Sequence, residues 1–208
     1  MTLRPLLARL ATALLILPSG CASLSGATTE PIGDHRVEYV VARHARGTVV
    51  FENGLGGTFD WWAKVFPAIA QDTTAFAYNR PGYGRSDPVA TPRDGAHVVD
   101  ALRALLRHAG LEPPYVLVGH SLGGLYMQYY ARRYPDEVRA LILVDSTHPA
   151  QLQGAGAREN WPAWARVAFD LTTSDTAQAE LAAVNATGEA LLKLPPPRDM
   201  PVIILSAQ

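Results

Sequence analysis

Short runs of β-branched and other apolar residues alternate with helical patterns from residue 37 to the end of the chain. This alternation predicts an α/β protein with a mostly parallel sheet flanked by helices. The run Leu141-Ile142-Leu143-Val144 is apolar throughout, which is typical of a strand buried on both faces. The expected strands span residues 37–42, 48–51, 74–78, 115–118, 140–144 and 202–205.

The composition is that of one ordinary globular domain, with 208 residues, 48% apolar and 18% charged. Lys and Arg number 18 against 19 Asp and Glu, so the chain lacks the basic footprint of a nucleic-acid-binding protein. The single cysteine, Cys21, leaves neither an internal disulfide nor a thiolate cluster for a metal. We therefore expect no nucleic-acid partner and no metal.

The first residues have the pattern of a secretory signal. Arg4 and Arg9 precede an apolar run over residues 10–18, and small residues then lead to Cys21. The run is shorter than the roughly 20 apolar residues that span a bilayer. We therefore expect export from the cytoplasm.

Leu17-Pro18-Ser19-Gly20-Cys21 resembles a bacterial lipoprotein box, with the leucine one place earlier than usual. The resemblance implies lipidation of Cys21 and a tether to a membrane of the cell envelope. The alternative is an ordinary cleaved signal with an unmodified cysteine. We assign residues 1–30 to signal and tether and 31–208 to the domain, with 149–197 as a helical, lid-like insertion.

A serine stands between glycines in Gly119-His120-Ser121-Leu122-Gly123, after an expected strand and before a helical pattern. This is the sequence pattern of a nucleophile elbow, in which the serine sits on a strained turn. Gly119 and Gly123 lack side chains, so the turn can pass close to neighbouring backbone. The amide of Leu122 would then point at a substrate oxygen. A purely structural turn is the alternative.

With these residues the chain resembles the α/β-hydrolase superfamily from about residue 35 to its end. The resemblance implies a serine hydrolase that acts on a small-molecule acyl substrate with Ser121 as nucleophile and without a cofactor. The segment Phe51-Glu52-Asn53-Gly54-Leu55-Gly56-Gly57 matches the family's oxyanion loop, with asparagine where histidine is usual. By this resemblance, the amide of Leu55 completes the oxyanion hole. A phosphate-binding loop is the alternative, but the glycine spacing does not fit it.

A second segment, from Tyr78 through Asn79-Arg80-Pro81-Gly82 to Asp87, resembles a family turn whose role is mainly scaffolding. Gly54, Gly56 and Trp61 are candidates for the substrate pocket. Trp62, Trp161 and Trp164 are further candidates, although aromatic residues on amphipathic helices are more often core residues.

The resemblance implies a chain order of serine, then acid, then histidine. The family acid follows the seventh strand, which residues 202–205 resemble, and the family histidine comes after the eighth. His148 is the one histidine that comes after the elbow, and Asp145 and His148 could serve as acid and base. Otherwise Asp145 caps a strand end and His148 lies at the surface or in a pocket wall.

The economical interpretation is a fragment of a longer hydrolase whose acid and base follow Gln208, with weak or no activity as given. A catalytically silent binding protein of the same fold is the rival hypothesis. A haloperoxidase or a C–C bond hydrolase would use the same nucleophile and stays open.

Overall fold

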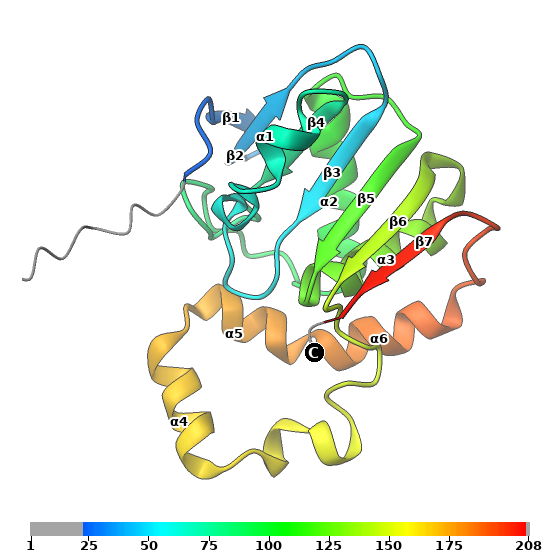
Figure 1. Cartoon of the computed structure of the whole chain (residues 1–208). Helices are drawn as coiled ribbons and strands as arrows, with labels where there is room; N and C mark the ends of the chain where they lie inside the picture. Colours follow the sequence, from blue (N-terminus) through cyan, green and yellow to red (C-terminus); the bar gives the residue numbers. More distant parts are fainter. Residues whose placement is uncertain (1–22, 207–208) are drawn as a thin grey trace, which may run out of the picture.

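The computed structural model describes residues 23–206, so Cys21 and the predicted signal lie outside the described residues. A seven-stranded sheet forms the centre of the molecule (Figure 1). Its strands are β1 (Thr28–Ile32), β2 (His35–Ala42), β3 (Thr48–Glu52), β4 (Thr74–Tyr78), β5 (Tyr115–His120), β6 (Val138–Val144) and β7 (Val202–Leu205).

The strand order is β1-β2-β4-β3-β5-β6-β7. The five strands from β4 to β7 pair in parallel, whereas β1 and β2 join the edge in antiparallel fashion. The α/β class and the mostly parallel sheet are thereby confirmed, and every expected strand is present. Strand β1 was not expected, because its sequence Thr-Thr-Glu-Pro-Ile carries little β signal.

Helices cover both faces of the sheet. One face packs on α2 (Gly95–His108) and α3 (Leu122–Arg133), and the other on the short elements η1 (Phe59–Trp62) and α1 (Phe66–Ile69). Asp94 is the N-cap of α2, and its carboxylate accepts from the amides of Ala96 and His97. Its buried positions, such as Val98, Leu102 and Leu105, share one face.

Two expectations from the sequence were wrong. The boundary at residue 30 lies too late, because Leu24 is a core residue whose amide donates to the Asp60 carboxylate, and β1 begins at Thr28. Burial on both faces, which was expected for residues 141–144, is incomplete, and β7 is exposed at every position. In β6, Leu141 and Leu143 are buried and the residues between and after them are half-buried.

After β6, the predicted insertion (the insert, residues 149–197) folds into helices. They are η3 (Gly154–Gly156), η4 (Arg158–Asn160), α4 (Ala163–Thr172), α5 (Asp175–Ala182) and α6 (Val184–Lys193); the short η2 (Pro135–Glu137) precedes β6. Figure 1 shows α5 and α6 along the end of the sheet to which β3 and β5 point.

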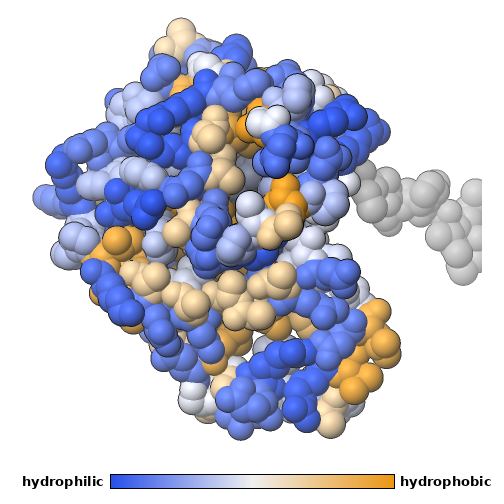
Figure 2. All heavy atoms as spheres, turned by 180° about the vertical axis from the view of Figure 1, so that it is seen from behind, coloured by the Kyte–Doolittle hydropathy of each residue, from blue (hydrophilic) through white to orange (hydrophobic). Residues whose placement is uncertain are grey.

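Helix α6 is part of the main core, with Val184 and Leu191 buried, whereas α4 buries no residue. Seen from behind, the insert arches away from the body and leaves a hollow within it (Figure 2). Within residues 23–206, no helix has the length and apolar character needed to cross a membrane.

Candidate active site

Ser121 lies in the sharp turn between β5 and α3. Its backbone has φ 50° and ψ -121°, a region that residues with a side chain adopt at a cost of about 1–3 kcal/mol. The side chain is half-buried, at the edge of the sheet where the parallel strands end. Ligands of parallel α/β sheets bind at this edge. A strained, accessible hydroxyl at this position is suited to attack a bound substrate.

The two glycines that flank the turn are required by close backbone contacts. A Cβ on Gly119 would come within 2.6 Å of the Gly123 carbonyl oxygen. A Cβ on Gly123 would come within 2.5 Å of the carbonyl oxygens of Glu52 and Asn53. Both obstacles are backbone atoms, so only glycine lets the turn approach the end of β3 this closely.

The loop after β3 (the oxyanion loop, residues 53–57) lies directly against the elbow. A Cβ on Gly54 would be 3.2 Å from Ser121 Cβ and 2.9 Å from His120 Nδ1. The amide of Gly57 donates to the carbonyl of Gly54 at 3.3 Å and closes the loop. The half-buried Leu55 lies within this turn, so the structure brings three predicted site segments together: Gly54, Leu55 and Ser121.

Leu122 is the first residue of α3. The first amides of a helix have no acceptor within it and carry the positive end of the helix dipole. A negative oxygen that develops beside Ser121 would therefore meet a favourable field.

Asn53 fixes the first residue of the oxyanion loop to the core. It is fully buried, donates from Nδ2 to the Tyr78 carbonyl at 2.9 Å, and accepts from Trp62 Nε1 at 2.8 Å. Trp62 is therefore a core residue and not a pocket wall. Trp61, by contrast, is 54% exposed and stands edge-on to the His120 ring at 5.5 Å. Its position beside Gly54 keeps it a candidate for the substrate pocket.

The turn after β4 has the scaffolding role expected of it. Asn79 is buried, accepts from the Phe59 amide at 2.8 Å, and donates to Glu38 at 2.8 Å. These bonds hold η1 against β2.

Arg80, the next residue, is buried in a cluster of charges that the sequence did not reveal. Its guanidinium donates to Glu52 Oε1 at 2.5 Å and to both oxygens of Glu180 at 2.8 and 2.9 Å. Glu52 also accepts from the Tyr78 hydroxyl at 2.5 Å, and Glu180 accepts from Tyr83 at 2.9 Å. The three charged side chains come from β3, the turn after β4 and α5, and no sequence spacing relates them.

Burial and charge act in opposite directions within this cluster. Burial raises the pKa of the Glu52 carboxyl, and Arg80 and Tyr78 oppose that rise. Burial alone would lower the pKa of Arg80, but Glu180 and Glu52 raise it well above its ordinary value. Arg80 therefore stays charged at any pH at which the protein is folded.

The structure does not join the candidate acid and base to the nucleophile. Asp145 and His148 are both exposed, and Asp145 has a positive φ of 45°. His148 Nδ1 accepts from the Ala150 amide at 3.1 Å. Within residues 23–206, no hydrogen bond links His148 to Asp145 or to Ser121.

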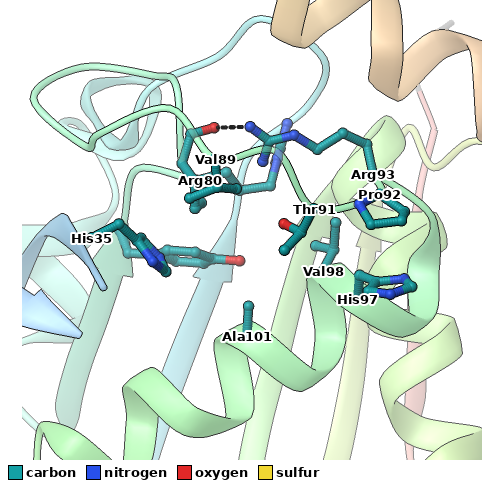
Figure 3. A pocket seen from close by; sticks show the side chains of 11 residues that line it. His35, Arg80, Val89, Thr91, Pro92, Arg93, His97, Val98 and Ala101 are labelled. Carbon is teal, nitrogen blue, oxygen red and sulfur yellow. Dashed lines mark hydrogen bonds between the residues drawn. The ribbon is translucent and has the colours of Figure 1, made fainter. Parts of the chain in front are cut away.

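A cavity of about 130 Å³ lies on the other side of Arg80, between the segment after β4 and α2. Figure 3 shows His35, Val98 and Ala101 around it, with Arg93 donating to the Pro81 carbonyl at 2.7 Å. Ser121 does not line this cavity, so the cavity is separate from the elbow.

A model of a protein family described as alpha/beta hydrolase fold matches residues 47–202. The human (lyso)-N-acylphosphatidylethanolamine lipase is 29% identical over 159 residues, which cover 71% of this chain and 44% of that protein. The chain thus spans less than half the length of this curated relative.

Solved structures share the fold at lower identity. A lipase described as putative from Acinetobacter baumannii AYE has a TM-score of 0.57 at 21% identity, with 84% of this chain and 64% of that chain covered. An alpha/beta hydrolase fold protein from Burkholderia ambifaria has a TM-score of 0.65 at 19% identity, with 88% and 80% covered.

Proposed function

Because the chain belongs to the alpha/beta hydrolase fold family, we propose that it is a serine hydrolase that cleaves an ester, amide or related acyl bond. Ser121 is the nucleophile and carries the acyl group of the intermediate. The observation that carries this proposal is the positive φ of Ser121 in a half-buried turn at the carboxyl end of β5, against the oxyanion loop.

In this proposal the amides of Leu55 and Leu122 form the oxyanion hole. Attack by the serine hydroxyl places a negative charge on the former carbonyl oxygen of the substrate. Two amides that are already in place stabilise that charge, and removal of one such donor costs about 10²–10³ in turnover in a related chemistry. Trp61, Gly54 and Gly56 would line the approach to this position.

We further propose that an acid and a histidine after Gln208 complete the triad. The support for this is the family's chain order of serine, acid and histidine, together with the exposed position of His148, which makes no hydrogen bond to Ser121 in the described residues. The human relative is named as a lipase, so a lipid acyl ester is the first substrate class to test. A chain extended by the residues that follow Gln208 should hydrolyse a short p-nitrophenyl ester several decades faster than residues 1–208.

The proposal is tested by reaction with a fluorophosphonate probe, which phosphonylates activated serines. Peptide mass spectrometry should locate the label on Ser121, and Ser121→Ala should abolish it. The matched control is Ser146→Ala, which removes a part-buried hydroxyl that accepts from Gln128 Nε2 at 3.1 Å. Label in the Ser121→Ala protein at the wild-type level would contradict the proposal. An extended chain that takes up no label would favour a silent binding protein of the same fold.

We also propose that the mature protein is exported and tethered to a membrane through lipid on Cys21. The support for this is the sequence pattern of residues 1–21.

A further inference from the structure

Arg80 uses every hydrogen-bond donor that its guanidinium offers. Besides the carboxylates of Glu52 and Glu180, Nη1 donates to the Asn53 carbonyl at 2.6 Å and Nη2 donates to the Gly54 carbonyl at 2.8 Å. An arginine side chain has five N–H groups, and each of them has an acceptor here. The guanidinium therefore binds the carbonyls of Asn53 and Gly54, two successive residues of the oxyanion loop, and holds them in one orientation.

The hydrogen bond from Arg80 to the Gly54 carbonyl determines where the Leu55 amide points. The carbonyl of Gly54 and the N–H of Leu55 belong to one peptide unit, which is planar and trans, so the two groups point in opposite directions. With the Gly54 oxygen drawn toward Arg80, the Leu55 N–H is turned to the opposite side. A rotation of this one peptide plane would turn the N–H away from a substrate oxygen.

The other end of the guanidinium reaches the insert. Glu180 lies on α5 and binds Arg80 with both carboxylate oxygens, and Tyr83 donates to the same carboxylate. The contact is tight, because a Cβ on Gly82 would come within 2.3 Å of Thr176 Oγ1 on α5. Arg93 also fixes the Pro81 carbonyl next to Arg80 (Figure 3).

Stability alone does not explain this arrangement. A buried ion pair is often no more stabilising than apolar side chains of similar volume, because the charges lose their hydration. A planar guanidinium adds geometric specificity, because its rigid set of N–H groups holds hydrogen-bond acceptors at fixed angles.

We infer that Arg80 is a positioning residue that holds the Leu55 amide in the oxyanion hole, and that Glu180 makes this position depend on docked α5. The inference rests on the proposed function. The insert then takes part in building the hole.

The test uses the whole chain and two variants. Glu180→Gln keeps the shape of the side chain but removes its charge, and Arg80→Lys keeps the charge but loses the fork. The matched control is Glu137→Gln, because Glu137 also binds an arginine, Arg103, with both oxygens and accepts from a tyrosine away from the elbow.

The first measurement is amide hydrogen exchange in residues 53–59, which needs no catalytic activity. The Gly57 amide donates to the same Gly54 oxygen as Arg80, so it reports on the position of that carbonyl. Glu180→Gln and Arg80→Lys should each speed exchange in this segment about tenfold, and Glu137→Gln should leave it unchanged. Unchanged exchange in both folded variants would overturn the inference.

The second measurement is the acylation of Ser121 by p-nitrophenyl acetate. Loss of an interaction made in the transition state lowers kcat and leaves KM nearly unchanged, so both variants should lose about tenfold in kcat. A faster-exchanging loop with wild-type kcat would also overturn the inference. This acylation is measured in the chain extended beyond Gln208, where the proposed acid and histidine lie. If the extended wild-type chain is not acylated, the proposed function fails, and the exchange measurement alone decides whether Arg80 and Glu180 hold the loop.

Discussion

Ser121 has φ 50°, in a region of backbone conformation that steric contacts make unfavourable for residues with a side chain. The strained turn places the half-buried hydroxyl at the end of β5. The surrounding contacts of Gly119 and Gly123 enforce the conformation. Under the proposed function, the conformation that makes this hydroxyl accessible therefore also costs stability.

We expect Ser121→Gly to raise the free energy of unfolding by about 1 kcal/mol. Relief of a strain of about 1–3 kcal/mol exceeds the extra unfolded-state entropy of glycine, about 0.5–1 kcal/mol. Urea unfolding at neutral pH measures the difference. Ser121→Ala is the control, because it removes the hydroxyl and keeps the Cβ. A glycine variant no more stable than the alanine variant would mean that the turn is unstrained.

At this scale the sequence predicted the strained turn at Ser121 but not its surroundings. The glycine spacing around Ser121 is local and carries its own physical reason. The cluster of Arg80, Glu52 and Glu180 is not local: Glu180 lies 100 residues from Arg80. Charged residues are mostly exposed, so burial of these three could not be expected from their types.

Among the elements, α2 is held to η2 by a part-buried ion pair. Arg103 donates to both oxygens of Glu137, and Tyr130 on α3 donates to the same carboxylate at 2.7 Å. Partial burial would raise the pKa of Glu137, but the hydrogen bonds from Arg103 and Tyr130 outweigh it and lower the pKa. Three elements therefore meet at one ionised carboxylate.

Protonation of the Glu137 carboxylate should account for part of the loss of folding stability at low pH. A lowered folded-state pKa gives stability that is present above the unfolded value of 4.5 and is lost as the pH falls through the folded-state pKa. Glu137→Gln should cost about 1–3 kcal/mol at neutral pH, and the difference from wild type should shrink at about pH 3. Urea unfolding at both pH values tests this, with the exposed Glu189→Gln as control. A difference independent of pH would assign the effect to packing.

The sequence predicted elements well where their signal is periodic. Val98, Leu102 and Leu105 recur at helical spacing, and the buried face of α2 agrees with that spacing. The exposure of β7 could not be predicted, because an apolar run indicates a strand without showing what packs on it.

On the scale of the whole molecule, the sheet and its helices follow from the alternation in the sequence, whereas the path of the insert does not. Helix α6 returns to the core beside α3, and α4 stays outside it. The packing of these two helices depends on contacts between segments that are distant in the sequence, and local sequence patterns do not show such contacts.

The attachment of the molecule is tested through Cys21. Expressed with its own leader in a bacterial host, wild-type protein should fractionate with membranes, and Cys21→Ser should move most of it to the soluble fraction. Ser25→Ala is the control. Equal membrane fractions for wild type and Cys21→Ser would contradict lipidation at this residue.

Strand β7 is the outermost strand on one side of the described sheet, and Ile203 and Ile204 are 51% and 68% exposed. Unpaired backbone flanked by aliphatic side chains is where copies of a protein begin to add strand to strand. The highest concentration at which this chain stays in solution should therefore be set by self-association of folded protein and not by unfolding. Ile204→Lys should raise the concentration at which the solution stays clear.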